Sequence, residues 1–211
     1  MVAKASLEIQ LAEGLAELGL SLPAHAPARL LRYLALLQKW NRVYNLTAIR
    51  EQQRLVTHHL LDSLVVLPHL PPGEIVDVGT GAGLPGIPLA IARPDQQVTL
   101  ADSNHKKGAF LKQVVIECEL RNVEVNIGRV EDWHPPKPFP VAISRAFSDL
   151  PGFAEAAGHL VGDHGVLAAM KGIYPDEELA QLPPHLRVDS VIALQVPGLR
   201  AARHLVLFRR V

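Results

Sequence analysis

The chain has 211 residues, of which 48% are hydrophobic and 20% charged, so its length and composition are those of one globular core with a small appendage. Lysine and arginine together number 21, as do aspartate and glutamate, which excludes a protein-wide attraction to polyanions and leaves only local patches for any nucleic acid. The single cysteine, Cys118, excludes an internal disulfide and a cysteine-rich metal site, and the lack of a signal-like or membrane-length apolar run predicts a cytoplasmic protein.

The first third of the chain is predicted to be helical. Apolar residues recur at helical spacing over residues 6–20 and 27–49, and a further helix is expected over 51–67. A cluster of prolines after residue 67 then breaks the pattern. We therefore expect an N-terminal helical cap over residues 1–67 and a main domain over residues 68–211, packed together as one compact unit.

Beyond the prolines, strand and helix patterns alternate, which predicts a parallel sheet covered by helices. The last two predicted strands follow each other without a helix between them, so they are expected to form an antiparallel hairpin. The predicted fold class is therefore α/β, with a seven-stranded, mostly parallel sheet that ends in a C-terminal hairpin. Strands are expected over residues 74–79, 97–102, 123–130, 141–146, 165–171, 185–196 and 203–211, and helices over 86–93, 105–120, 150–160 and 176–182.

The segment IVDVGTGAGLPGIPLA, residues 75–90, predicts a buried strand, a glycine-rich turn and the start of a helix. Glycines let such a turn bend tightly and approach a ligand closely. Gly81, Gly83 and Gly86 satisfy the pattern GxGxxG, so NAD is one candidate ligand. Asp102 ends the next predicted strand about 20 residues further on, where a carboxylate can accept hydrogen bonds from the ribose of NAD or of S-adenosylmethionine. A helix N-cap or a solvated turn position remains the alternative role for Asp102.

The motifs around this turn narrow the choice of ligand. DVGTGAG, a carboxylate at the end of the second strand and a terminal hairpin together resemble the class I S-adenosylmethionine-dependent methyltransferases. Nearly the whole chain resembles one family of them, the bacterial 16S rRNA guanine-N7 methyltransferase G family, once called glucose-inhibited division protein B. The blocks that carry this resemblance, in the family's order and spacing, are WNRVYNLTAI, HHLLDSL, GTGAGLPGIPLA, DSNHKK, GRVEDW and ISRAF.

The resemblance implies a set of residues that bind S-adenosylmethionine. It places the ribose on Asp102, the adenine edge at Val130 and Glu131, and the methionine end, or an approaching phosphate, at Arg145. Ordinary strand-end positions for Val130 and Glu131, and a surface salt bridge for Arg145, remain open. The cofactor candidates in full are Asp77, Gly79, Gly81, Gly83, Leu84, Asp102, Ser103, Val130, Glu131 and Arg145.

The implied reaction is methylation of guanine nitrogen 7 in the 530 loop of the small-subunit rRNA. Nitrogen 7 has an in-plane lone pair and no proton, so no catalytic acid or base is required, and positioning alone can lower the barrier by roughly 7–11 kcal/mol. Arg145 and Asn45 are the positioning candidates. Cys118 lies within a helix pattern and is expected to be a buried hydrophobe, not a nucleophile. The chain has SRAF where methyltransferases of exocyclic amines usually carry an NPPY-like turn.

Contacts with RNA are expected from asparagines of the cap and from local basic residues. For the asparagines, helix capping and turn formation are an equally open role. Because basic and aromatic residues are few, the expected substrate is a shaped particle, the 30S subunit or its precursor, bound by a monomer. His58, His59 and Asp62 suit helix packing, and no metal site is expected. The RNA candidates are Asn41, Asn45, Lys106, Lys107, Arg145 and Arg203.

Three other functions remain open. A small-molecule methyltransferase would have a closed pocket, whereas an RNA enzyme would have an open, basic rim beside Arg145. An NAD oxidoreductase would need a catalytic His–Tyr–Lys set and a substrate domain, and neither is recognisable in the sequence. A ribosome-assembly factor could use the same nucleotide fold to bind its ligand without turnover.

Overall fold

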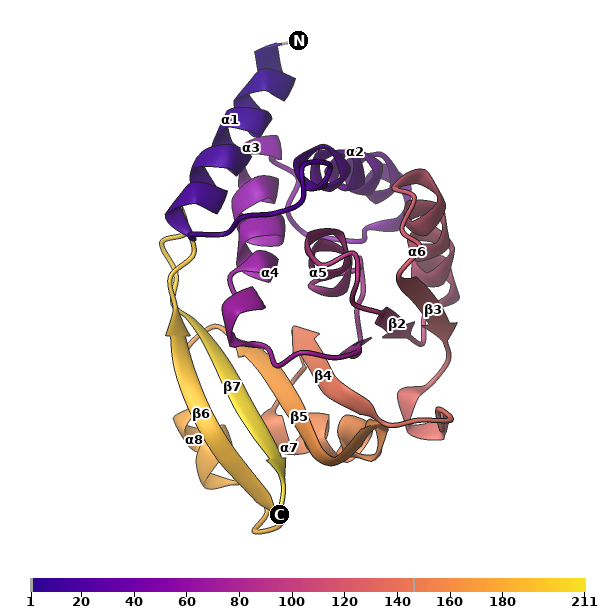
Figure 1. Cartoon of the computed structure of the whole chain (residues 1–211), viewed down its shortest axis with the longest axis vertical. Coiled ribbons are helices and arrows are strands. Elements are labelled where there is room, and N and C mark those ends of the chain that lie inside the picture. Colours follow the sequence, from indigo (N-terminus) through magenta and orange to yellow (C-terminus); the bar gives the residue numbers. More distant parts are fainter. Residues whose placement is uncertain (1, 146) are drawn as a thin grey trace.

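The computed structural model describes residues 2–145 and 147–211, with side chains from Ala5 onward. Its strands form one seven-stranded sheet in the order β3-β2-β1-β4-β5-β7-β6 (Figure 1). Ala146, the fourth residue of the ISRAF block and the last of the strand predicted over 141–146, lies outside the described residues. The strands are β1 (Ile75–Val78), β2 (Val98–Asp102), β3 (Val123–Ile127), β4 (Phe139–Arg145), β5 (Val161–Lys171), β6 (Leu186–Leu194) and β7 (Arg203–Arg210).

The first five strands pair in parallel, and β7 is antiparallel to both β5 and β6. The predicted α/β fold with a C-terminal hairpin is therefore confirmed. Between β1 and β4 the chain changes the direction in which it adds strands. In open α/β sheets, ligands bind at the carboxyl ends of the strands on either side of such a switch point. The ends of β1 and β4 are therefore the place to look for a site.

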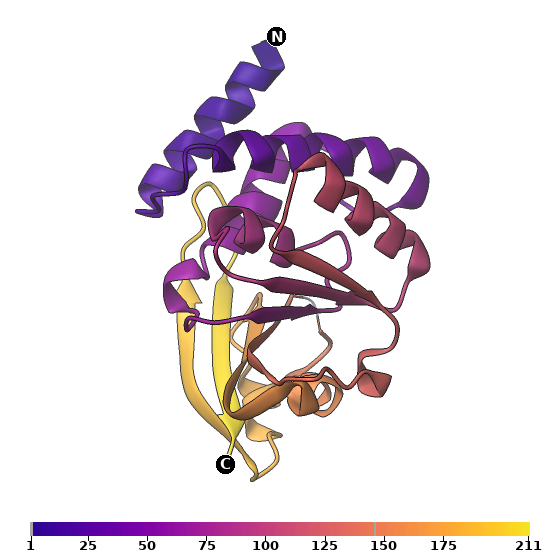
Figure 2. The same ribbon diagram turned by 45° about the vertical axis from the view of Figure 1, so that its right-hand side comes forward.

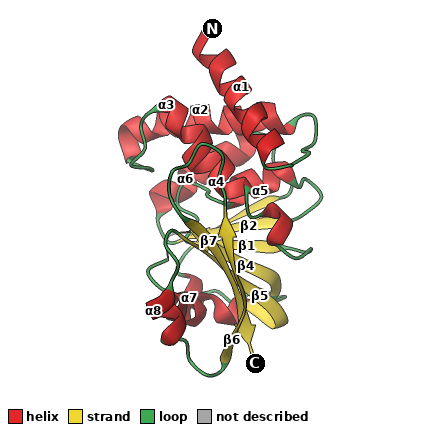
Figure 3. Ribbon diagram, turned by 90° about the vertical axis from the view of Figure 1, so that its left-hand side faces the viewer, coloured by secondary structure: helices red, strands yellow, loops and turns green. Residues whose placement is uncertain are grey.

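Helices cover both faces of the sheet (Figures 2 and 3). The helices α5 and α6 lie on one face under an outer layer formed by the N-terminal helices, and α7 and α8 lie on the other face. None of the described helices combines the length and the apolar character needed to cross a membrane. The helices are α1 (Val2–Glu17), α2 (Ala26–Tyr44), α3 (Gln52–Leu55), α4 (Asp62–Leu64), α5 (Gly86–Ala92), α6 (His105–Glu117), α7 (Leu150–Ala157) and α8 (Asp176–Ala180).

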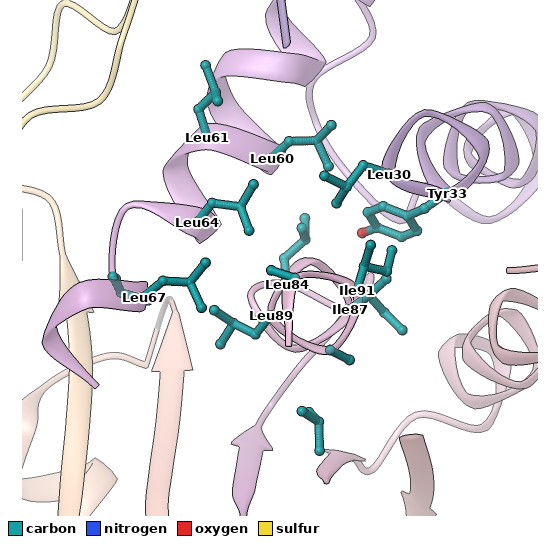
Figure 4. Packing of buried hydrophobic residues seen from close by; sticks show 14 of the residues in the cluster. Leu30, Tyr33, Leu60, Leu61, Leu64, Leu67, Leu84, Ile87, Leu89 and Ile91 are labelled. Atoms are coloured by element: carbon teal, nitrogen blue, oxygen red, sulfur yellow. The ribbon is translucent and has the colours of Figure 1, made fainter. Parts of the chain in front are cut away.

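One cluster of buried apolar side chains joins the N-terminal helices to the sheet. Figure 4 shows Leu30 of α2 and Leu60 of the segment after α3 lying beside Ile87 of α5. Each of these three side chains is completely buried. Buried area of this kind contributes roughly 25 cal/mol per Å², so removing the outer helices would expose a large part of the core. The segments on either side of residue 67 thus share one core.

The predicted helix over 27–49 is too long. It ends at Tyr44, because Asn45 adopts a left-handed conformation with φ 49°, the usual way in which a helix stops. The helix expected over 51–67 is also not regular. It runs through α3, a π-helical turn (Val56–Leu61), α4 and a 3₁₀ turn (Leu67–His69).

The predicted third strand, over 123–130, is also too long. It ends at Ile127, which pairs with Asp102, the last residue of β2. Beyond that register β3 has no neighbouring strand to pair with. The next residues instead form a 3₁₀ turn over Val130–Asp132.

Candidate active site

The glycine turn after β1 has two parts with different roles. Gly79 and Gly81 have φ of 68° and 61°, and a Cβ added to either would meet no atom closer than 3.8 Å. A Cβ on Gly83 would lie 2.5 Å from Cγ1 of Ile87, and one on Gly86 would collide with Leu100 of β2. The first two glycines therefore leave open space in front of the turn. Gly83 lets the turn lie close to side chains of α5 and α6, and Gly86 allows α5 to pack closely against the sheet.

That open space belongs to a cavity of about 480 Å³ at the carboxyl ends of β1 and β4. Its size is within the usual range for small-ligand pockets. Of the predicted cofactor residues, it is lined by Gly79, Gly81, Leu84 and Arg145. Other lining residues come from the loop after α2, the helix α6 and the end of β4: Leu46, Thr47, Lys107, Ser144, Phe147 and Ser148.

Asp102 ties the glycine turn to the start of α6. Its Oδ2 accepts a hydrogen bond from the backbone N–H of Gly81 at 2.9 Å and lies 3.4 Å from Nζ of Lys107, and its Oδ1 accepts from the N–H of Asn104 at 2.9 Å. Oδ1 has this one donor and keeps further acceptor capacity for a ribose hydroxyl. The N-cap of α6 is Asn104, whose side chain accepts from the N–H groups of Lys106 and Lys107. This role of Asn104 is not among the sequence predictions, although an asparagine just before a helix pattern is a sufficient signal for an N-cap.

Asp77 supports the same turn from below. Its side chain is fully buried, and Oδ2 accepts from the hydroxyl of Thr80 at 2.5 Å and from the N–H of Gly86 at 2.7 Å, while Oδ1 has no hydrogen-bond partner. Burial raises the pKa of Asp77 to about 6. Asp77 does not line the cavity. It acts on the ligand space through the turn that it holds.

Tyr33 connects the N-terminal helices to the turn. Its ring is fully buried, and its hydroxyl donates a hydrogen bond to the carbonyl oxygen of Ala82 at 2.7 Å. Burial raises the pKa of Tyr33, so the phenol stays protonated. Tyr33 is not among the residues predicted from the sequence, because one tyrosine on the apolar face of a helix is indistinguishable there from a core residue.

Arg145 reaches the cavity from the end of β4 and is held by a buried acid. Its Nη1 donates to Oδ2 of Asp62 at 3.2 Å and to the carbonyl oxygen of His58 at 3.1 Å, and Nε of Arg203 donates to Oδ1 of Asp62 at 2.7 Å. The side chain of Asp62 is only 4% exposed, against 23% and 24% for the two arginines. Asp62 follows a π-helical turn, a feature that is frequent at functional sites. The helix-packing role predicted for Asp62 does not include this triad, whose members lie far apart in the sequence.

The loop after α2 is fixed at the cavity by side-chain hydrogen bonds. The buried amide of Asn41 donates to the carbonyl of Thr47 and accepts from its N–H, both at 2.9 Å. Nδ1 of His59 donates to a backbone carbonyl, so its Nε2 accepts from the hydroxyl of Thr47 at 3.0 Å. Burial and the charge of Arg145 lower the pKa of His59 to about 4, and the ring is neutral at pH 7. Asn45 is exposed and accepts from Nη2 of Arg50 at 3.0 Å.

The remaining predicted residues lie outside the cavity. Val130 and Glu131 are in the 3₁₀ turn beyond β3, where Glu131 pairs with Arg129 at 3.4 Å. Ser103 and Lys106 are exposed at the start of α6. Within the part of the chain that the structure describes, no three His, Cys, Asp or Glu side chains are grouped as metal ligands. Cys118 is buried, and burial raises the pKa of its thiol to about 11.

Comparison with known proteins decides between the open alternatives. A family model described as "GidB: rRNA small subunit methyltransferase G" matches residues 27–206. This chain belongs to that family. Proteins named ribosomal RNA small subunit methyltransferase G from Nitrosospira multiformis and Laribacter hongkongensis are 56% and 55% identical to it, each over 95% of this chain and over 96% and 97% of their own lengths. The resemblance drawn from the sequence blocks is confirmed. None of the three alternatives, the small-molecule methyltransferase, the NAD oxidoreductase and the non-catalytic ribosome-assembly factor, is favoured.

Solved structures agree with the fold. A SAM-dependent methyltransferase from Aquifex aeolicus has a TM-score of 0.58 at 18% identity, over 75% of this chain and 93% of that one. An O-methyltransferase, NcsB1, crystallised with S-adenosylmethionine and a naphthoic acid, has a TM-score of 0.51 at 18% identity, over 66% of this chain and 49% of that one. At such low identity the likeness concerns the fold of a class I methyltransferase and not the substrate.

Proposed function

We propose that this protein transfers the methyl group of S-adenosylmethionine to nitrogen 7 of a guanine in 16S rRNA. The resemblance to the methyltransferase G family implies that this guanine is in the 530 loop. The observation that supports the proposal is the cavity in front of Gly79 and Gly81, which lies at the switch point of the sheet. The chain belongs to the rRNA small subunit methyltransferase G family, so this cavity is the expected cofactor site. The cofactor supplies an electrophilic methyl group on its sulfonium. The chain's own task is to hold that methyl in line with the target nitrogen.

The residues present suit this cofactor. We assign the ribose to Asp102, whose Oδ1 keeps a free acceptor position, and the methionine end to the space before Gly79 and Gly81. The adenine edge is assigned to Val130 and Glu131, one strand further along the sheet edge from Asp102. Arg145 is assigned to the methionine carboxylate, since its guanidinium is the cation that β4 contributes to the cavity.

No general base is required for this reaction. Guanine nitrogen 7 attacks through its lone pair and loses no proton, so catalysis rests on alignment, which can contribute roughly 7–11 kcal/mol. The product guanine is cationic and would be repelled by an unpaired arginine next to it. The carboxylate of Asp62, hydrogen-bonded to Arg145, offsets part of that charge. Asn45 is placed on the loop beside the cavity, where we assign it to orienting the base.

The substrate we propose is the small ribosomal subunit or a precursor particle, modified by a monomer in the cytoplasm. Formal net charge is zero, so strong binding to free RNA through general electrostatics is not expected. Lys106, Lys107 and Arg203 lie near the carboxyl edge of the sheet, where the RNA would arrive. A structured particle can present the guanine to this limited set of contacts.

The test is a methylation assay with labelled S-adenosylmethionine and 30S subunits that lack the modification, followed by mapping of the labelled base. We expect label at a single 7-methylguanosine in 16S rRNA. Label on another atom, or binding of the cofactor with no transfer, would contradict the proposal. Equal rates on naked 16S rRNA and on 30S particles would contradict the particle as the substrate and leave the chemistry in place.

A further inference from the structure

A second cavity, of about 500 Å³, lies on the other side of the loop that borders the cofactor cavity. It is bounded by α2, by residues 47–50 of the loop and by α3. Thr47 lines both cavities, so one residue of the loop separates them. A ligand in the second cavity would therefore lie across Thr47 from a ligand in the cofactor cavity.

The walls of this second cavity combine positive charge with apolar and amide surface. Arg42, in the last turn of α2, and Arg50, in the loop, are both exposed at it, and no acidic residue is among the described residues that line it. Its apolar lining consists of the half-buried Ile49 together with Leu37 and Leu55, both buried. Among its polar lining residues, the amides of Gln38 and Gln52 bond to each other at 3.1 Å.

These features match a nucleotide. Two guanidinium groups at the mouth suit a phosphate, which arginine binds with directed, charge-assisted hydrogen bonds. An apolar lining beside paired amides suits the face and the edge of a base. We propose that this second cavity binds one nucleotide of the RNA strand next to the target guanine, an inference that rests on the proposed function.

The surface next to the second cavity favours an RNA strand over a free nucleotide. The helices α2 and α6 run antiparallel, since Arg32 pairs with Glu117 and the rings of Trp40 and Phe110 lie 5.6 Å apart. The end of α2 is therefore level with the start of α6, where Lys106 and Lys107 lie. Along this edge Val43 and Tyr44 of α2 are 70% and 44% exposed, so an aliphatic and an aromatic side chain are open to solvent there. A strand that leaves the second cavity can follow this apolar and basic edge to the cofactor cavity.

The experiment removes the two cations. The variant Arg42→Gln with Arg50→Gln is assayed for methylation of unmodified 30S subunits and for affinity to them at several salt concentrations. We expect KM for 30S to rise by about tenfold or more, and the slope of log K against log salt to fall by about 1.4, the value for two phosphate contacts on a single strand. Affinity for S-adenosylhomocysteine, measured by calorimetry, should be unchanged.

The matched control is Arg121→Gln with Lys137→Gln, which removes the same charge. Both residues are exposed and precede β3 and β4, at the amino edge of the sheet opposite the site. An equal rise in KM for both double variants would reduce the effect to overall charge and overturn the proposal, as would no change in the first variant. If the wild-type protein neither binds nor methylates 30S, the proposed function itself fails, which is a distinguishable result.

A second variant tests the cavity and not the charge. Gln52→Trp places a large ring at the exposed position where α3 borders the cavity, with both arginines retained. We expect a raised KM for 30S with an unchanged salt slope, because the base is excluded while the phosphate contacts stay. Unchanged KM in this variant, with an intact fold shown by circular dichroism, would overturn the assignment of a base to this cavity.

Discussion

At the scale of single residues, the shape of the glycine turn depends on three polar side chains from three different elements. Asp77 of β1 holds Thr80 and Gly86, Asp102 of β2 holds Gly81, and Tyr33 of α2 holds Ala82. A turn with left-handed glycines is entropically costly to order, so fixed contacts on both sides reduce what the cofactor must supply on binding. The cofactor space is in this sense pre-organised by the fold.

Replacing Asp102 with alanine should weaken binding of S-adenosylmethionine by about 1–3 kcal/mol. The variant loses the proposed acceptor for the ribose and also frees the N–H groups of Gly81 and Asn104, so a small loss of thermal stability should accompany it. Calorimetric titration with S-adenosylhomocysteine measures the affinity. Asp95→Ala, at an exposed position in the loop between α5 and β2, is the control and should bind normally. Unchanged affinity in the Asp102 variant would place the ribose elsewhere.

Removing one hydroxyl from Tyr33 tests whether the cap shapes the cofactor site. Tyr33→Phe keeps the ring and its packing against Phe110 but strands the carbonyl of Ala82 without this donor, at a cost of about 1–3 kcal/mol. We expect lower stability to urea and a several-fold weaker affinity for S-adenosylhomocysteine. Tyr174→Phe, where the hydroxyl is on an exposed residue, should change neither. If only stability falls in the Tyr33 variant, the bond has no part in shaping the site.

At the scale of elements, the sequence predicts what is local and misses what is brought together over a distance. The strand, glycine turn and Asp102 lie close together in the sequence, and their spacing is a recognisable pattern. Asp62 and Arg203 are separated by 141 positions and meet only through the packing of the π-helical turn against the sheet. The end of β3 differs from its prediction for the same reason, since the end of its pairing with β2 decides it. The end of α2 is set locally by the left-handed Asn45, which the apolar spacing does not reveal.

The triad of Asp62, Arg145 and Arg203 is the contact that joins the π-helical turn to β4 and β7. Asp62→Asn removes the charge that two partly buried arginines share, and we expect a loss of about 3 kcal/mol in the free energy of unfolding. This is the lower end of the usual range, because each arginine is about a quarter exposed. KM for S-adenosylmethionine should rise as well, since Arg145 loses its fixed orientation.

A second aspartate that bridges two arginines is the natural comparison. Asp189 contacts Arg187 and Arg209 on the exposed hairpin. Because water screens such pairs, Asp189→Asn should cost about 0–1 kcal/mol and leave KM unchanged. Urea unfolding of the two variants provides the contrast, and equal losses would show that the triad contributes no more than a surface pair.

At the scale of the whole molecule, two buried groups, one in the cap and one in the sheet, change the free energy of unfolding in opposite directions as pH falls. The pKa of His59, near the loop after α2, falls from 6.5 to about 4, and that of Asp77, under the glycine turn, rises from 3.8 to about 6. As pH falls below 6.5, the unfolded chain takes up the histidine proton first, so His59 lowers stability. Over the same interval the folded state takes up the proton of Asp77 first, so Asp77 raises stability. The two contributions offset each other between about pH 4 and pH 6.

Replacing His59 should make the contribution of Asp77 to the pH dependence of stability measurable. The His59→Gln variant lacks the loss of stability that His59 causes on acidification. The difference in free energy of unfolding, variant minus wild type, should therefore increase by about 2 kcal/mol as pH falls from 7.5 to 5. The variant's own stability should then increase as pH falls through 6, because the pKa of Asp77 remains raised by burial. Urea unfolding at several pH values measures both curves, with His25→Gln at an exposed position as the control. Wild-type and His59→Gln curves that stay parallel over this range would mean that His59 titrates alike in the folded and the unfolded chain.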